Sequence, residues 1–173
     1  MSALLKKDRK IIICDPDKCT GCEICEFVCS LVHEQEFNPY HSNIRRVRIE
    51  PILNFALSCQ FCKDPACIRA CPTKALTQDD KTGRIIVDDA KCDGCGHCFK
   101  ACQFGAIHMD LREEKARMCD QCKDIELNGE TGPQCVIYCP KEALEFTTLE
   151  SFSDKVARKS VEMLLNAYIE GKE

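Results

Sequence analysis

Cysteine spacing constrains this chain more than any other feature. Of its 173 residues, 17 are cysteines, and all but one of these fall into groups of four. The first and third groups have the spacing C-x2-C-x2-C-x3-C, the second has a longer middle gap, and the fourth has a twelve-residue insert in place of that gap. The groups are Cys19, Cys22, Cys25 and Cys29; Cys59, Cys62, Cys67 and Cys71; Cys92, Cys95, Cys98 and Cys102; and Cys119, Cys122, Cys135 and Cys139. Such spacing predicts loops that gather thiols around metal.

Iron-sulfur chemistry explains this spacing. Three cysteines a few residues apart can hold one [4Fe-4S] cubane, while the fourth reaches a neighbouring cluster, so the groups are expected to work in pairs. Pro72 and Pro140 follow the last cysteine of groups two and four. A proline there turns the chain away from the cluster, because its φ angle is fixed and it has no amide donor. Ser30 and Gln103 stand at this point in the other two groups.

Two other uses of cysteine compete with this interpretation. Roughly one residue in ten is cysteine, as in secreted disulfide scaffolds, but the start MSALLKKDRKIII has charges where an export signal would be apolar. Zinc is the stronger alternative, because C-x2-C pairs hold tetrahedral zinc. Zinc binding suits the fourth group best. If all four groups bound zinc, the chain would be a zinc-stabilised structural adaptor.

Composition favours an electron carrier over an enzyme or a nucleic-acid binder. Aromatic residues make up 6% of the chain and tryptophan is absent, so metal ligation must supply part of the folding free energy. The net charge of −4 would fall to about −12 if four clusters each added about −2, which disfavours nucleic acid. The sequence has no G-x-G-x-x-G motif, no P-loop and no free nucleophile with a histidine partner, so we expect no catalysis by the chain itself. We also expect no membrane span and a cytoplasmic location.

Positive charge is concentrated in two stretches. One contains Arg45, Arg46 and Arg48, and the other contains Arg112, Lys115 and Arg117. They are either solvated faces or contacts for an acidic partner.

Local patterns predict short strands alternating with cluster loops. Residues 11–14 and 84–87 are apolar and β-branched and predict strands, and residues 78–83 between groups two and three predict a turn. Residues 26–34 predict a helix that carries Cys29. The insert at 123–134 has Asn128-Gly129 and no apolar face, which predicts a surface loop.

The cysteine-free segment after residue 150 predicts a helix. Val161, Leu164, Leu165 and Tyr168 have helical spacing, Ser151 and Asp154 resemble a capping box, and Gly171 is placed to end the helix. This helix either packs onto its own chain or lies in a groove of a partner.

Cys14 and the histidines fall outside the groups. A buried free cysteine behaves as a small hydrophobic residue, and that is our interpretation of Cys14. His97 lies between Cys95 and Cys98, so a hydrogen bond that tunes a nearby cluster is more plausible than ligation.

The order of the groups, with CQFCKDPAC second and the long insert last, resembles the four-cluster subunits of the dimethyl sulfoxide reductase and formate dehydrogenase beta-subunit family. It is also similar to the small polyferredoxin subunits of tungsten aldehyde oxidoreductases. The resemblance covers residues 11–146. It implies an α+β, loop-rich fold of two nested ferredoxin-like modules (βαβ-βαβ type) with a C-terminal helix. Module A would comprise residues 1–58 and 113–148, module B residues 59–112, and residues 149–173 the helix for docking or packing.

The resemblance also implies the ligands of four [4Fe-4S] clusters. These are Cys19, Cys22, Cys25 and Cys139 for cluster 1; Cys29, Cys119, Cys122 and Cys135 for cluster 2; Cys59, Cys62, Cys67 and Cys102 for cluster 3; and Cys71, Cys92, Cys95 and Cys98 for cluster 4.

The function implied is relay of electrons to or from a large catalytic subunit, most plausibly a tungsten or molybdenum oxidoreductase acting on an aldehyde, formate or a similar substrate. A flavin or other electron-acceptor subunit is a further possible partner. The alternative within the same chemistry is a freely diffusing polyferredoxin that serves carbon monoxide dehydrogenase or hydrogenase.

Overall fold

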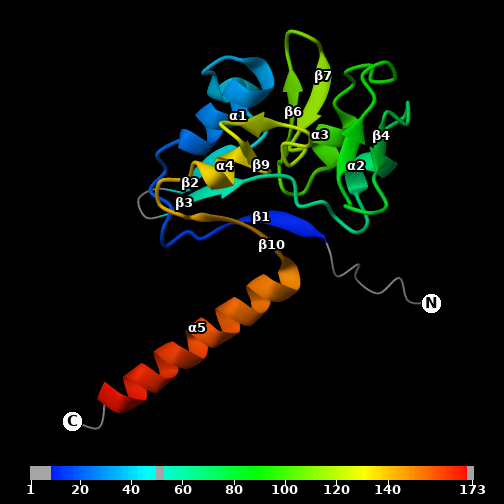
Figure 1. Ribbon diagram of the computed structural model, residues 1–173. Helices are drawn as coiled ribbons and strands as arrows, with labels where there is room; N and C mark the ends of the chain where they lie inside the picture. The colour runs from blue at the N-terminus through cyan, green and yellow to red at the C-terminus, as the bar shows by residue number, and fades with distance from the viewer. Residues whose placement is uncertain (1–8, 50–52, 171–173) are drawn as a thin grey trace.

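Short helices and paired short strands form a loop-rich body, from which one long helix leads away (Figure 1). The computed structural model describes residues 9–49 and 53–170. The elements are β1 (Lys10–Cys14), α1 (Ile24–Glu34), the 3-10 turn η1 (Pro39–His41), β2 (Arg45–Ile49), β3 (Leu53–Leu57), α2 (Ala66–Arg69), β4 (Leu76–Gln78), β5 (Ile85–Val87), α3 (His97–Ala101), β6 (Ile107–Asp110), β7 (Lys115–Met118), β8 (Glu126–Leu127), β9 (Glu130–Thr131), α4 (Gln134–Ile137), β10 (Leu144–Thr148) and α5 (Leu149–Glu170). This confirms a mixed α+β, loop-rich fold.

All the described strands pair in antiparallel two-stranded sheets. Four are local hairpins, β2 with β3, β4 with β5, β6 with β7, and β8 with β9. The fifth pairs β1 with β10, so that Ile11 lies opposite Thr147 and Cys14 lies opposite Leu144. Figure 1 shows these two strands side by side beneath the body. The first and fourth cysteine groups are therefore brought to one place, where α1 packs against α4. In the middle of the chain α2 packs against α3.

The apolar core is small and is shared with the cysteines. Ile12, Ile44 and Leu76 are among its buried aliphatic side chains. Cys29 and Cys135 are buried in the same cluster. The thiols thus occupy positions that aliphatic groups fill in an ordinary domain.

Each cysteine loop turns at the same point. The second residue after the first cysteine has a left-handed backbone in all four groups: Gly21 (φ 71), Phe61 (φ 44), Gly94 (φ 74) and Gln121 (φ 63). A residue with positive φ changes the direction in which the backbone turns. This allows a short loop to direct successive thiols toward one centre. The repeat inferred from spacing is therefore also a repeat of backbone conformation.

Most predicted local elements are present. The strand predicted at 11–14 is β1, the helix predicted at 26–34 is α1, and the return strand predicted at 84–87 is β5. The insert at 123–134 was predicted to be a surface loop. Most of its residues are exposed, as expected, but it also contains the short β8–β9 hairpin. Asn128 and Gly129 at its tip both have positive φ, 54 and 83, as a tight I′-type turn requires.

The long helix α5 begins where the expected C-terminal segment begins, but its cap is not the predicted one. Its first residue is Leu149, and the Thr148 hydroxyl accepts the Ser151 amide at 3.2 Å, so Thr148 takes the capping role expected of Ser151. The proposed stop at Gly171 lies outside the described residues. Lys155 pairs with Glu145, and Lys159 lies 3.5 Å from Asp17.

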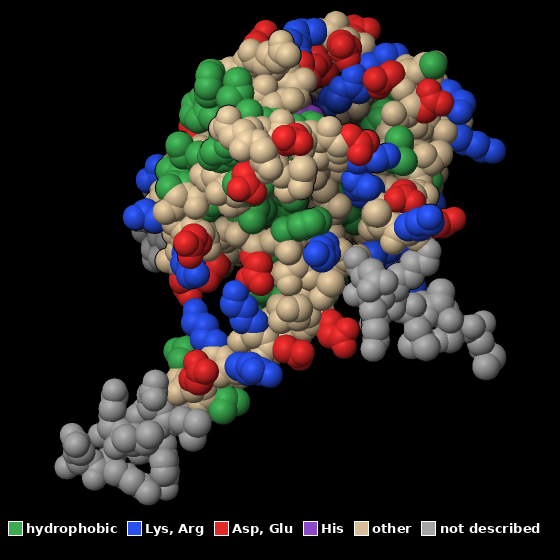
Figure 2. Space-filling view, viewed as in Figure 1, with side chains coloured by type: hydrophobic (Ala, Val, Ile, Leu, Met, Phe, Trp, Pro, Cys, Tyr) green, Lys and Arg blue, Asp and Glu red, His purple; other side chains and the backbone are tan. Residues whose placement is uncertain are grey.

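Beyond these ties α5 extends away from the body and carries side chains of both charges (Figure 2). Val156, Val161 and Met163 are exposed. Among the described residues, no helix combines the length and apolar character needed to cross a membrane.

The third cysteine loop offers a test of its backbone geometry. A Cβ at Gly94 would lie 2.4 Å from the Glu114 carbonyl oxygen, whereas one at Gly96, also left-handed at φ 71, would meet nothing within 4 Å. We expect Gly96→Ala to cost about 1–2 kcal/mol from backbone strain alone and Gly94→Ala to cost clearly more. Guanidinium midpoints followed by circular dichroism measure both. Equal losses would contradict the role of the Glu114 contact.

Candidate metal centres

Four groups of thiols converge in the structure, and each joins three cysteines of one sequence group to the last cysteine of another. The first lines a pocket between loop 19–25 and the segment that follows α4, from Cys139 to Leu144. In the others, neighbouring thiols lie close enough to raise one another's pKa. The groups are Cys19, Cys22, Cys25 and Cys139; Cys29, Cys119, Cys122 and Cys135; Cys59, Cys62, Cys67 and Cys102; and Cys71, Cys92, Cys95 and Cys98. We refer to them as centres one to four.

Short helices hold the third cysteine of each loop, and α1 also holds the fourth cysteine of the first loop. Cys25 and Cys29 lie on α1, Cys67 on α2, Cys98 on α3 and Cys135 on α4. Because α1 packs on α4 and α2 on α3, the fourth cysteine of one loop reaches the three-cysteine loop of the other. The crossing of ligands between paired loops is thus a consequence of helix packing.

Backbone amides point at several of these sulfurs. The Ala75 amide donates to Cys71 Sγ at 3.2 Å and the Ala143 amide to Cys139 Sγ at 3.3 Å, in each case from four residues further along the chain. Asn43 donates to Cys29 Sγ at 3.3 Å. Amide donors stabilise a thiolate over a thiol. The sulfurs are therefore prepared for the charged state in which they bind metal.

Burial opposes that charged state when no cation is present. Desolvation raises the pKa of Cys25 and of Cys59 to about 12, and it raises the pKa of the buried Cys119 and Cys135 well above the ordinary thiol value. Nearby thiols add to the shift at these four cysteines. A bound cation removes the conflict between buried thiolates, so the donor set fits a metal-sulfur cluster.

The centres differ in their access to solvent. All four thiols of centre two are buried, whereas Cys22 of centre one and Cys95 of centre four are exposed. In centre three Cys59 is buried and the other thiols are partly buried. Centre two is therefore the most enclosed and centres one and four the most open.

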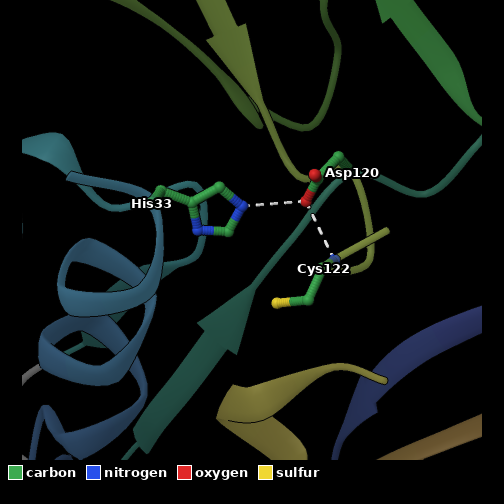
Figure 3. A group of neighbouring side chains, drawn as sticks. All are labelled: His33, Asp120 and Cys122. Carbon is green, nitrogen blue, oxygen red and sulfur yellow. Dashed lines mark hydrogen bonds and ion pairs between the residues drawn. The ribbon is translucent and has the colours of Figure 1, made fainter. Parts of the chain in front are cut away.

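Sequence reasoning gave His33 no special role, yet it contacts centre two (Figure 3). Its Nε2 lies 3.0 Å from Asp120 Oδ1, and the ligand atoms of His33, Asp120 and Cys122 all lie within 4.8 Å of one another. Burial alone would lower the pKa of His33, but hydrogen bonds to Asp120 and Cys29 outweigh it and raise the pKa to about 11. The only sequence signal is that His33 follows Cys29 by one helical turn.

Cys14 is buried beside centre one. The Ala56 amide donates to its sulfur at 3.3 Å, and Cys19 and Cys139 are its thiol neighbours. Desolvation raises its pKa to about 12. The structure confirms that Cys14 is buried, as the sequence predicted.

Most cations of the two basic stretches form hydrogen bonds or ion pairs within the chain. Arg45 donates to the Pro39 and Tyr40 carbonyls at 3.1 and 2.9 Å, and Arg46 pairs with Glu23 at 2.6 Å. In the second stretch Arg112 pairs with Glu34 at 2.8 Å, Arg117 pairs with Asp89 at 2.6 Å, and Lys115 donates to the Cys92 carbonyl. These five cations therefore join separate segments of the body, which weakens the interpretation of either stretch as a docking face.

Comparison with known proteins adds independent information. The pattern described as "4Fe-4S dicluster domain" matches residues 51–149. The polyferredoxin-like subunit of aliphatic sulfonate oxidoreductase from Pyrococcus furiosus is 37% identical, covering 82% of this chain and 80% of that protein. The thiosulfate reductase electron transfer subunit PhsB of Salmonella typhi is 30% identical, covering 81% and 76%. One subunit of the anaerobic dimethyl sulfoxide reductase of Escherichia coli is 30% identical, covering 82% and 74%.

Among solved structures, the chain is similar to part of the active site complex BamBC of benzoyl coenzyme A reductase in complex with benzoyl-CoA. The sequence identity is 23% and the TM-score is 0.46, with 88% of this chain and 96% of that chain covered.

Glu26, next to Cys25, allows a test of the electrostatics around centre one. Its side chain is buried and accepts the Arg46 amide at 2.8 Å. Burial raises its pKa, although the Arg46 amide counteracts this. A raised pKa means that ionised Glu26 destabilises the folded state, fully above the folded pKa and not at all below the unfolded one.

We therefore expect Glu26→Gln, which keeps the amide contact, to be more stable than the parent near about pH 8, with a gain that shrinks toward about pH 5. Guanidinium midpoints across this range provide the measurement. As a control, Glu23→Gln loses the ion pair with Arg46 and should cost up to about 1 kcal/mol. Destabilisation by Glu26→Gln at every pH would contradict this account.

Proposed function

The chain belongs to the 4Fe-4S dicluster domain family, and from that premise we propose that it is an electron-transfer subunit carrying four [4Fe-4S] clusters. It relays electrons to or from a catalytic subunit and performs no substrate chemistry itself. A [4Fe-4S] cluster supplies reversible one-electron storage, and the protein supplies its ligands, hydrogen bonds and degree of burial.

We propose that each centre holds one cluster through its four thiols. The observation that carries this proposal is the crossing of ligands, because in every centre three thiols come from one loop and the fourth from a partner loop. Zinc sites do not require this arrangement, since four nearby ligands already complete a tetrahedral site. The crossed pattern is the one used by two-cluster ferredoxins.

The same contacts support two nested modules. Pairing of β1 with β10 and packing of α1 on α4 support module A, formed by residues 1–58 and 113–148. Packing of α2 on α3 beside the β4–β5 hairpin supports module B, formed by residues 59–112. Residues 149–173 form a separate C-terminal segment.

Solvent access suggests how the clusters are ordered for electron transfer. Centres one and four, with the exposed thiols of Cys22 and Cys95, are the proposed ends of the relay. The enclosed centres two and three lie between them in the relay. Electrons would enter at one exposed end and leave at the other, and burial alone does not fix the direction.

The proposed partner is a large catalytic oxidoreductase subunit of the molybdenum or tungsten class, with a flavin or other acceptor subunit as a second partner. The names of the relatives, subunits of sulfonate, thiosulfate and dimethyl sulfoxide redox enzymes, support such a complex. Exposed Val156, Val161 and Met163 on α5 give a stably bound subunit an additional contact. A cytoplasmic location is proposed because free thiols persist in reducing compartments.

The decisive experiment is a metal count on the protein purified without oxygen, with any partner removed. About sixteen iron atoms per chain are expected from four cubanes. Cys135→Ala should lose one cluster's share, about a quarter of the iron, because it removes a ligand of centre two. Cys14→Ala is the matched control, as a buried cysteine outside the ligand sets, and should keep all of the iron.

Other outcomes would point elsewhere. About four zinc atoms per chain with little iron would replace the relay with a structural adaptor. Full iron content with no stable partner on gel filtration of native extract would favour a freely diffusing polyferredoxin. Loss of iron in Cys14→Ala equal to that in Cys135→Ala would contradict the ligand assignment.

A further inference from the structure

We infer that His33 is a positioning residue for centre two, where it joins the helix that supplies Cys29 to the loop that supplies Cys119 and Cys122 and so sets the reduction potential of the cluster bound there. This inference rests on the proposed function, because it requires a cluster at centre two.

His33 reaches both sides of the centre from α1. It follows Cys29 by four residues, so the two side chains lie on the same helix face. Its Nδ1–H donates to the Cys29 carbonyl at 2.9 Å and lies 3.8 Å from Cys29 Sγ. Its Nε2–H donates to Asp120 Oδ1 at 3.0 Å. The side chain is only 14% exposed, so both contacts are largely shielded from solvent.

Asp120 connects His33 to the loop that carries Cys119 and Cys122. It lies between Cys119 and Cys122, and the same Oδ1 that accepts from His33 also accepts the Cys122 amide at 2.9 Å (Figure 3). One carboxylate oxygen therefore links the imidazole to the backbone of a ligand. The Arg84 side chain, from the turn before β5, reaches the Asp120 carbonyl at 3.5 Å.

This arrangement differs from the surroundings of two other fourth cysteines. Cys71 and Cys139 each accept an amide from four residues further along the chain. Cys29 lies inside a continuing helix, where the amide four residues on belongs to the helix hydrogen-bond ladder. It instead accepts the Asn43 amide, with His33 alongside. At Cys71 and Cys139 the hydrogen-bond donor to the sulfur comes from the next few residues of the chain. At Cys29 the donors come from Asn43 and His33 instead.

The chemical consequence is a change in potential. Reduction adds negative charge to a cluster, and hydrogen-bond donors near its sulfurs stabilise that charge and raise the potential. Without His33, Cys29 loses a nearby N–H group and the Asp120 carboxylate loses its neutralising partner. Both changes disfavour the reduced state. The cluster at centre two should then become harder to reduce, while the other clusters keep their potentials.

The experiment is a redox titration of the oxygen-free holoprotein, followed by electron paramagnetic resonance. His33→Gln, close in size, and His33→Leu are compared with the parent protein. His41→Leu is the matched control, because His41 is 17% exposed and pairs with Glu36 at 3.4 Å rather than with Asp120. Iron per chain is measured on every sample, so that failure of the proposed function would appear in the parent protein itself.

We expect one cluster of four to shift to lower potential in His33→Leu by at least about tenfold in its reduced-to-oxidised ratio, which is about 59 mV for one electron. His33→Gln should shift less, because its amide can still donate to Asp120. Loss of only that cluster in His33→Leu, with retention in His33→Gln, would support the same role. Titrations that superimpose on the parent or on His41→Leu would overturn it, as would loss of all clusters in both His33 variants.

A double-mutant cycle separates positioning from a general packing effect. Asp120→Asn retains an oxygen for the Cys122 amide but removes the carboxylate that His33 holds. If His33 acts through Asp120, most of the shift caused by His33→Leu should be absent in the Asp120→Asn background. Shifts that simply add would overturn the link between the two residues.

Discussion

The structure depends on one constraint: its cysteines are buried, and burial disfavours the thiolate form in which cysteine binds metal. Desolvation drives the pKa of Cys119 and of Cys135 far above the ordinary thiol range, so these groups are neutral unless a cation holds them. The helices that position them are too short to persist alone, since α2 and α4 have 4 residues each. Ligation must therefore provide what helix length and apolar core do not. For such a chain, folding and cluster binding are one thermodynamic process.

The crossing of ligands makes that process cooperative. On the proposed assignment, Cys29 leaves its own loop to join Cys119, Cys122 and Cys135, while Cys139 makes the reciprocal connection to the first loop. Each of these two clusters then ties together segments separated by roughly a hundred residues. A bond that closes so long a loop restricts the unfolded chain strongly. Pairing of β1 with β10 brings the same segments together through backbone hydrogen bonds, so the sheet and the clusters enforce one topology.

Sequence was most informative where the chemistry is local. Cysteine spacing predicted the four loops, because ligand spacing is a short-range requirement, whereas the choice of which loops pair came from the resemblance to a known family. Prediction from sequence failed where a side chain finds a distant partner. The ion pair of His33 with Asp120 spans 87 positions, and Arg46 is fixed by Glu23 from another element. Such contacts depend on how the loops pack, and nothing in the neighbouring residues signals them. The cap of α5 was assigned to Ser151 instead of Thr148, because both are hydroxyl residues suited to the same capping role.

Small departures from the repeat can make the centres inequivalent. At three of the four fourth cysteines, the helix ends before the cysteine, and a left-handed residue follows the cysteine three positions later: Lys74, Gly105 or Glu142. After Cys29 the helix instead continues to Glu34, and the sulfur depends on Asn43 and His33. Identical ligands with different donors and different burial have different potentials. A relay needs such differences, because identical clusters would give electrons no preferred position along it.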